Sequence, residues 1–307
     1  MRSGPRLRIL TVWLLSATLA AFGQKATEDA SQPKLTLGQK ATEETSQPKL
    51  TFGGEPLVLP LECREEHLLR AGLVCNDVTP CTLVLELAGI GSLGDRIFVI
   101  GNVHASTGTV SSVLLASEDG GTTWAEPIER ISGGSLEIFR SVGPENGWIG
   151  GQQWEADSSP IPFLLATRNG GERWTRHNVW EQDDRNGIVL KFDFETERHG
   201  YLVIERTNTD VDPFELYETM TAGSSWGIRE LTSEEPEIPF KVVEAAQDRR
   251  LRGDVSNGAY WIEEKQGDGW KPLAAFAPHV GTCNNMERGD AKSIGPAGPG
   301  IQGALRP

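Results

Sequence analysis

The chain has 307 residues, of which 43 are Asp or Glu and 29 are Lys or Arg, so its formal net charge at pH 7 is −14. Such a charge repels nucleic-acid phosphates and anionic lipid headgroups, which argues against nucleic-acid and membrane-surface partners. It favours solubility and leaves cationic partners open.

The N-terminus has the composition of a secretory signal peptide. Arg2, Arg6 and Arg8 precede an apolar run at residues 9–22, and small residues follow just ahead of Gln24. The run is shorter than the roughly 20 apolar residues that a transmembrane helix needs, so an uncleaved anchor is the less favoured alternative. We therefore expect a signal peptide at residues 1–23, a secreted or periplasmic protein, and no transmembrane segment after cleavage.

Polar segments flank the region that is expected to fold. A duplicated segment begins at Gly23 and again at Gly38, and it is rich in Lys, Glu, Thr, Ser and Gln. It buries too little apolar surface to offset the entropy of ordering, so we predict a disordered spacer at residues 24–56. Gly and Pro dominate residues 284–307, which are predicted to form a disordered tail.

Four cysteines suit a chain that leaves the cytosol, because disulfides persist in oxidising compartments. Two bridges are expected among Cys63, Cys75, Cys81 and Cys283, although the sequence does not choose among the three pairings. If Cys283 is paired, it joins the two ends of the folded region. A metal site is the less favoured alternative, because no Cys/His cluster has zinc-ligand spacing, and we expect neither a metal nor a cofactor.

Short apolar or alternating runs fill residues 57–283 and are separated by Gly, Asp and Asn. Their length and composition are those of β-strands. A long amphipathic helix is not indicated, and residues 63–73 are expected to form a short helix or a turn. The clearest strand candidates are residues 96–100, 112–116, 163–166, 201–204 and 260–262.

One eight-residue motif recurs within this region. Residues 117–124 fit the pattern Ser-x-Asp-x-Gly-x-Thr-Trp at every defined position. Residues 167–174 have Asn in place of Asp, residues 219–226 keep Gly and Trp without the acid, and a degenerate fourth copy ends at Trp270. Copies at intervals of about 50 residues indicate a repeat architecture. The defining residues are Ser117, Asp119, Gly121, Thr123, Trp124, Asn169, Gly171, Trp174, Gly223, Trp226 and Trp270.

This motif is the Asp box, or BNR repeat, and we interpret it as a hairpin turn between two strands of a propeller blade. The Asp or Asn side chain accepts backbone N–H groups across the turn, Gly supplies a positive φ, and Trp packs against the blade. Units that cannot bury a face alone stack radially. The predicted fold is an all-β small β-propeller of four to five blades at residues 57–283, with residues 74–90 left open as part of a fifth blade.

The sequence Asn-Gly-Trp-Ile-Gly-Gly at residues 146–151 precedes the second copy of the motif. This combination resembles the photosystem II assembly and stability factor family and its bacterial relatives over residues 90–272. Members are non-enzymatic lumenal propellers that hold a membrane-protein intermediate, so the resemblance implies a protein-binding scaffold. In that family an arginine-rich surface is tied to partner binding, and the matching residues here are Arg249, Arg250 and Arg252. A solvated strand edge is the alternative interpretation of these arginines.

Asp boxes also occur in sialidases and xyloglucan-cleaving glycosidases, and in sialidases they lie away from the catalytic centre. A sialidase needs an arginine triad, a Tyr nucleophile with a Glu partner, and an acid/base Asp. This chain has only three tyrosines, Tyr201, Tyr217 and Tyr260, and no early Arg-Ile-Pro signature. A glycosidase acid pair drawn from different blades is left open. We assign no catalytic residue.

Two tryptophans, Trp154 and Trp180, fall outside the repeats in polar segments with Gln, Glu and Asp. An indole beside amides and acids suits recognition of a sugar or a protein, and packing beneath its own loop is an equally favoured alternative. The preferred function is a secreted, non-catalytic scaffold that binds a protein or an assembly intermediate. The alternative is a secreted carbohydrate-binding protein, or a glycosidase of the sialidase or xyloglucanase type.

Overall fold

The structure is a computed structural model that describes residues 48–106, 108–154, 159–180, 185–209, 211–240, 248–254 and 258–284. Within these ranges the chain is almost entirely β, and the helix α1 (Glu65–Arg70) lies where a short helix or a turn is expected. The predicted signal peptide, residues 24–47 of the spacer and residues 285–307 of the tail lie outside the described residues. Among the described residues we find no helix with the length and apolarity that a membrane crossing requires.

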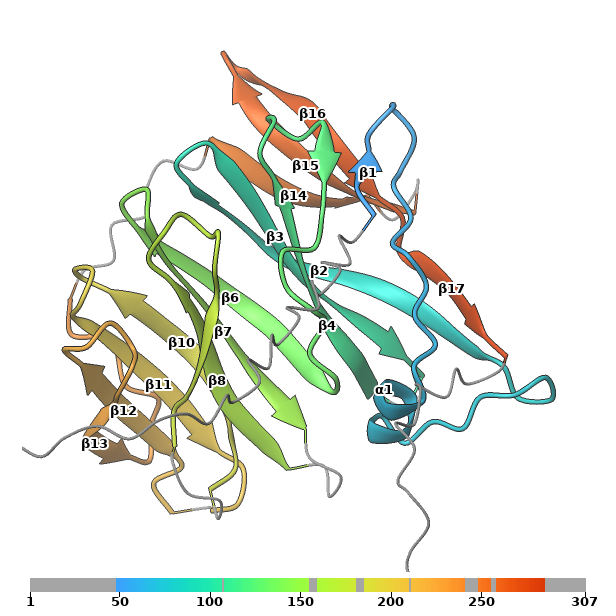
Figure 1. The fold of residues 1–307 in the computed structure, drawn as a ribbon. Helices are drawn as coiled ribbons and strands as arrows, with labels where there is room; N and C mark the ends of the chain where they lie inside the picture. The colour runs from blue at the N-terminus through green and yellow to red at the C-terminus, as the bar shows by residue number, and fades with distance from the viewer. Residues whose placement is uncertain are drawn as a thin grey trace, which may run out of the picture. The chain divides into compact units, whose positions relative to one another are not determined.

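Four antiparallel sheets form the blades (Figure 1). The strand orders are β17-β2-β3-β4 in the first blade, β6-β7-β8-β9 in the second, β10-β11-β12-β13 in the third and β14-β15-β16 in the fourth. This arrangement confirms the predicted all-β small propeller, with four blades in the described part of the chain. Residues 74–90 do not add a fifth blade, because residues 81–90 belong to β2 of the first blade.

The strands are β1 (Leu50–Thr51), β2 (Cys81–Leu93), β3 (Arg96–Ala105), β4 (Gly108–Ser117), β5 (Thr123–Trp124), β6 (Gly134–Val142), β7 (Asn146–Trp154), β8 (Pro160–Thr167), β9 (Thr175–Asn178), β10 (Gly187–Phe194), β11 (Gly200–Arg206), β12 (Phe214–Thr219), β13 (Gly227–Thr232), β14 (Arg249–Asp254), β15 (Ala259–Gln266), β16 (Gly269–Phe276) and β17 (His279–Cys283).

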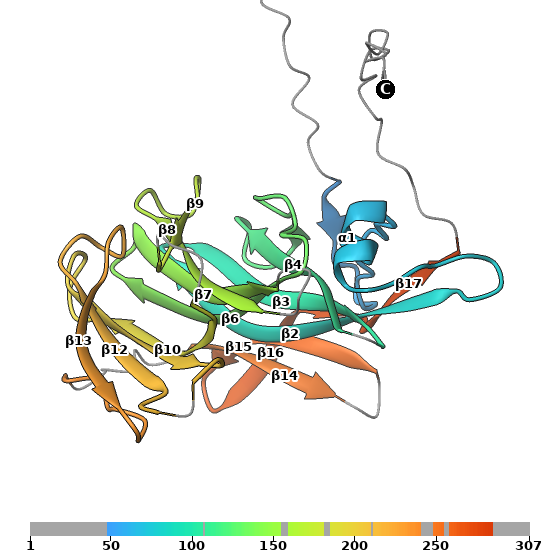
Figure 2. The ribbon, with the colours of Figure 1, turned by 90° about the horizontal axis from the view of Figure 1, so that it is seen from below.

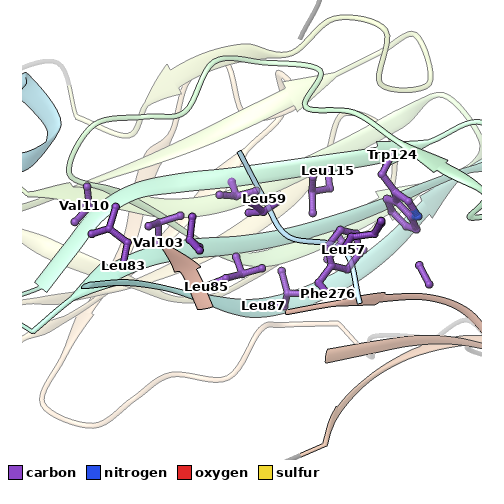
Figure 3. Close-up of a cluster of buried hydrophobic side chains, with 14 of the residues drawn as sticks. Leu57, Leu59, Leu83, Leu85, Leu87, Val103, Val110, Leu115, Trp124 and Phe276 are labelled. Atoms are coloured by element: carbon purple, nitrogen blue, oxygen red, sulfur yellow. The ribbon is translucent and has the colours of Figure 1, made fainter. Parts of the chain in front are cut away.

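The alternation of apolar and polar residues fixes which face of each strand is buried. In β2, Leu83, Leu85 and Leu87 are buried while the residues between them are exposed, because successive side chains of a strand point to opposite faces. The buried side chains gather in three apolar clusters. Figure 3 shows the first cluster, in which strands of the first blade contact Leu57 and Phe276. This core therefore contains residues from both ends of the folded region.

The two ends of the folded region are joined at the first blade. The last strand, β17, pairs with β2, and Leu57 pairs with Phe276 of β16. The Cys63–Cys283 disulfide spans a sequence separation of 220 residues, with Cα atoms 5.6 Å apart. Helix α1 lies beside this junction in both views (Figures 1 and 2). The expectation that Cys283 joins the two ends is confirmed.

A second disulfide, Cys75–Cys81, closes a short loop just before β2, so the expected number of two bridges is also confirmed. Within this loop the N–H groups of Val78 and Thr79 both donate to Asn76 Oδ1 at 2.9 Å. A side-chain acceptor of this kind satisfies the backbone of a tight turn.

The spacer prediction differs from the structure at its C-terminal end. Leu50 of β1 pairs with Trp124 of β5, and the Phe52 N–H donates to the Thr122 carbonyl at 2.9 Å. Leu50 and Phe52 pack against the first apolar cluster, and this burial offsets the entropy of ordering them. Residues 50–52 therefore belong to the folded region.

Candidate functional site

The first predicted Asp-box turn links β4 to β5 and is held by its own side chains. Ser117 Oγ accepts the Gly121 N–H at 2.8 Å, and Asp119 Oδ1 accepts the Thr123 N–H at 2.8 Å. The Thr123 hydroxyl donates to Asp119 Oδ2 at 2.7 Å, and Trp124 Nε1 donates to the Gly121 carbonyl at 2.9 Å. Hydrogen bonds from the Thr123 amide and hydroxyl lower the pKa of Asp119. This carboxylate is therefore engaged as an acceptor inside the turn.

The second turn, between β8 and β9, repeats this geometry with a neutral side chain. Thr167 Oγ1 accepts the Gly171 N–H at 3.0 Å, and Asn169 Oδ1 accepts the Arg173 N–H at 3.1 Å. Gly171 has a φ of 85°, which residues with a side chain rarely adopt. The Asn and Gly of the motif thus follow from the conformation of the turn.

The third turn, between β12 and β13, has a threonine in place of the acid. Thr219 Oγ1 accepts the Gly223 N–H at 3.1 Å, and Thr221 Oγ1 accepts the Ser225 N–H at 3.0 Å. The sequence pattern of residues 219–226 indicates only that the acid is lost. Thr221 stands at the Asp position of the motif, and its hydroxyl is the acceptor that replaces the carboxylate. A threonine at this position is the sequence signal for that replacement.

Replacing Thr221 with valine is expected to lower the free energy of unfolding by about 1 kcal/mol, because the Ser225 N–H loses its acceptor while the side-chain shape is kept. Thr221→Asp restores the acceptor of the first turn and is expected to keep the wild-type stability. Urea unfolding curves measure both variants. A Thr221→Val protein as stable as the wild type would contradict the assigned role of the hydroxyl.

The fourth predicted copy differs from the other three. Gly267 and Asp268 join β15 to β16 in a two-residue hairpin, across which Gln266 pairs with Gly269. Gly267 has a φ of 60°, which suits the first central position of such a hairpin. This turn is too short for the eight-residue motif, and Trp270 lies near the start of β16. The expectation of an Asp box at Trp270 is therefore not met.

The turns also connect neighbouring blades. Phe98 of β3 packs on the second turn so closely that a Cβ added at Gly171 would lie 2.2 Å from its ring atom Cζ. Trp148 Nε1 of β7 donates to the Ala222 carbonyl in the third turn at 2.9 Å. Each of these two turns thus packs on an aromatic residue of the preceding blade. Both turns therefore contribute contacts between adjacent blades.

Two of the three predicted arginines share one face of the fourth blade with two tryptophans. Arg250 and Arg252 of β14 donate through Nε to the two carboxylate oxygens of Glu263, at 2.7 and 3.0 Å. The Arg250 guanidinium lies 4.2 Å from the ring centroid of Trp270, and that of Arg252 lies 5.9 Å from Trp261. The Glu263 side chain is buried beneath half-exposed guanidiniums. We call these five residues the arginine–tryptophan face.

The third arginine, Arg249, lies on the opposite face of β14. Its guanidinium bonds to Glu264 at 3.0 Å and to Ser92 Oγ of the first blade at 3.0 Å. Alternation along the strand thus separates the three arginines that the sequence predicted as one group. Arg249 connects two blades, and each of the three arginines is paired with a carboxylate.

Glu263 is expected to make stability depend on pH. Burial acts to raise the pKa of its carboxyl, but hydrogen bonds from Arg250 and Arg252 outweigh burial and lower it. Because the pKa of Glu263 is lower in the folded than in the unfolded protein, the ionised carboxylate stabilises the fold. This stabilisation is complete above the unfolded-state pKa of about 4.3 and is lost as the pH falls through the folded-state pKa. Urea unfolding is therefore measured between pH 3 and pH 7. We expect the difference in free energy of unfolding between the wild type and Glu263→Gln to become smaller as the pH falls. A constant difference would contradict this.

The two predicted tryptophans lie at the same end of the second blade. Trp154 ends β7 and pairs with Pro160 at the start of β8. Trp180 follows β9, whose last residue Asn178 pairs with Phe163 near the start of β8. The three predicted Asp-box turns follow the other ends of β4, β8 and β12, so we call the end with the tryptophans the loop end.

The Trp180 indole takes part in a buried polar network. Trp180 Nε1 donates to Tyr217 Oη at 2.6 Å, and Arg185 Nη1 donates to the same oxygen at 3.2 Å. The Tyr217 hydroxyl donates to Glu215, which also pairs with Arg206 at 3.0 Å. Burial, and then the bond to Glu215, raise the pKa of Tyr217, so its hydroxyl stays protonated. This environment does not activate Tyr217 as a nucleophile.

Several carboxylates are placed as hydrogen-bond acceptors. Bonds from the Tyr201 hydroxyl and His199 lower the pKa of Glu218, as other donors do for Asp119 and Glu263. A glycosidase general acid needs the opposite shift, because it must be protonated at the start of the reaction. Within the described ranges, no group of three or more His, Cys, Asp or Glu side chains is placed to hold a metal ion.

No protein-family model matches the chain, and no curated protein matches it significantly. Among solved structures, a GH74 xyloglucanase from Xanthomonas campestris is 14% identical with a TM-score of 0.35, over 60% of this chain and 28% of that one. YCF48 bound to a D1 peptide is 16% identical with a TM-score of 0.32, over 61% of this chain and 56% of that one. An α-L-arabinanase from Penicillium chrysogenum is 15% identical with a TM-score of 0.34, over 74% of this chain and 66% of that one. At these values the similarities carry no functional information.

Proposed function

We propose that this protein is an exported, non-catalytic β-propeller scaffold built on Asp-box repeats, and that its arginine–tryptophan face binds a protein partner. The proposal includes the organisation predicted from sequence: a signal peptide at residues 1–23, a spacer, the propeller, and a tail at residues 284–307. Two disulfides support export to an oxidising compartment.

The observation that carries the proposal is the arrangement of Arg250 and Arg252 around Glu263. The buried carboxylate holds both guanidiniums by Nε, so their positions are fixed before a partner arrives. A surface organised in advance loses less conformational entropy on binding. Arg and Trp are also the residue types that most often dominate binding energy at protein interfaces.

The chemistry of the carboxyl groups supports binding over catalysis. Glu263 is the buried acid on this face, and its lowered pKa keeps it ionised. It therefore serves to position the arginines and does not supply a proton to a leaving group.

The test is affinity capture from an envelope fraction, using the protein and two variants. Arg250→Gln/Arg252→Gln removes both charges and is expected to lose the partner. Arg173→Gln, which changes an exposed arginine in the second Asp-box turn, is the matched control and is expected to keep it. Circular dichroism checks that the variants fold. Equal capture by all three proteins would overturn the proposal.

The second candidate function is carbohydrate binding at the loop end, where Trp154 and Trp180 lie. It is favoured by the indoles of these residues and by the amides near Trp154, which suit sugar recognition. A glycan array distinguishes the two functions, because the scaffold proposal predicts a protein partner whose capture depends on Arg250 and Arg252.

A further inference from the structure

The outer edge of the first blade holds a strand that comes from outside the repeats. Strand β5 (Thr123–Trp124) ends the first Asp-box motif and is joined to β4 by the bridge between Ala116 and Ala125. Strand β1 pairs with the other edge of β5, and the Phe52 N–H donates to the Thr122 carbonyl at 2.9 Å. In the described part of the chain, β9 and β13 have no further strand at the corresponding edges of the second and third blades. The first blade is therefore extended by strand addition.

Two alternate side chains hold β1 on this edge. Leu50 and Phe52 pack against the first apolar cluster, which contains the fully buried Trp124, whereas Thr51 between them is exposed. This alternation is that of a strand with one buried face. In strand addition, main-chain hydrogen bonds give affinity and pockets for alternate side chains give specificity. The edge of β5 therefore recognises an extended segment with apolar residues at two alternate positions.

The chain contains the sequence of this bound segment twice. Residues 48–53 have the sequence Pro-Lys-Leu-Thr-Phe-Gly, and residues 33–38 have the sequence Pro-Lys-Leu-Thr-Leu-Gly. The one difference is Leu37 in place of Phe52, which keeps an apolar side chain at that position. Residues 33–38 lie outside the described residues. Both apolar positions that β5 recognises are thus present in the first copy.

We propose that the outer edge of β5 is an exchangeable strand-binding site, and that residues 34–37 bind it in place of residues 49–52. In both arrangements one Leu-Thr-apolar strand pairs with β5, and the other copy is released. The exchange shortens the part of the chain that precedes the propeller by 15 residues, which is the spacing of the two copies. The site is separate from the arginine–tryptophan face and does not depend on the proposed scaffold function.

The connection to the rest of the fold permits this exchange. Leu57 is the next paired residue of the chain, and it is fixed against Phe276. Phe52 precedes Leu57 by 5 positions and Leu37 precedes it by 20. Loop-closure entropy grows only with the logarithm of the loop length, so a loop four times longer disfavours the first copy by only about tenfold. Either copy therefore reaches the site, and residues 49–52 are the favoured occupant.

The test is thermal unfolding of the protein and three variants. Leu50→Asp places a charge against the apolar cluster and is expected to lower the melting temperature, because it releases residues 49–52. Leu35→Asp alone is expected to leave the melting temperature unchanged, because residues 49–52 stay bound. Leu35→Asp/Leu50→Asp is expected to melt about 2–4 °C below Leu50→Asp, since neither copy then binds. A double variant that melts together with Leu50→Asp would overturn the proposal.

Thr36→Asp in the Leu50→Asp background is the matched control for the added charge. Thr36 stands at the position of Thr51, whose side chain is exposed. The control is therefore expected to keep the melting temperature of Leu50→Asp. A drop as large as that caused by Leu35→Asp would assign the effect to charge alone and would overturn the proposal.

A peptide supplies the first copy as a separate molecule. The peptide of residues 33–38, at about 10 mM, exceeds the millimolar effective concentration of a tethered segment. It is expected to raise the melting temperature of Leu35→Asp/Leu50→Asp, because it binds the folded protein alone. The same peptide with Leu35→Asp is expected to have no effect. Equal effects of the two peptides would contradict recognition by β5.

Protein concentration distinguishes exchange within one chain from exchange between two chains. The melting temperature of Leu50→Asp is expected to be independent of protein concentration, because residues 34–37 belong to the same molecule as β5. A melting temperature that rises with protein concentration would assign residues 34–37 to the site of a second copy and would overturn the exchange within one chain.

Discussion

Removal of the Cys63–Cys283 disulfide is expected to lower the free energy of unfolding by about 5 kcal/mol, because the bridge constrains almost the whole folded chain. It links residues separated by 220 positions in sequence. The entropy that a bridge removes from the unfolded state grows with the logarithm of the loop length. Urea unfolding of Cys63→Ala/Cys283→Ala beside the wild type measures the loss.

The second disulfide gives the matched control. Cys75 and Cys81 are separated by 6 positions, so Cys75→Ala/Cys81→Ala is expected to lose only about 2 kcal/mol. Both double variants remove one bridge and two sulfurs. Equal losses, or a larger loss from the short loop, would contradict the argument from chain entropy and would assign the effect to local packing.

The fold was predictable because its signals are local. An eight-residue turn motif and short alternating runs lie within single segments of the sequence, and both indicated a propeller. The disulfide pairing was not predictable, since it depends on β17 returning to β2, which no local pattern encodes. Trp270 was misinterpreted because the Gly-Asp-Gly before it suits a two-residue hairpin as well as an Asp box.

The candidate sites were less predictable than the fold. The run of arginines drew attention to β14, but strand alternation and pairing with β15 decided that Arg250 and Arg252 share Glu263 while Arg249 does not.

Gly171→Ala is expected to lower the free energy of unfolding by about 3 kcal/mol or more, because two unfavourable effects add. The φ of 85° strains any residue with a Cβ, and the new Cβ would lie 2.2 Å from Phe98 Cζ, well inside van der Waals contact. The Phe98 ring is fully buried between the first and second blades, so it has no room to move. Thermal and urea unfolding measure the loss.

The neighbouring glycine separates the two effects. Gly170 has a φ of 66°, but a Cβ there would meet only the Pro144 carbonyl oxygen at 3.5 Å, an ordinary contact. Gly170→Ala is therefore expected to lose about 1 kcal/mol, the backbone strain alone. The third turn supports this estimate, because Ala222 occupies the equivalent position with a φ of 56°. If Gly170→Ala and Gly171→Ala are equally destabilising, contact between the turn and Phe98 does not hold the blades together.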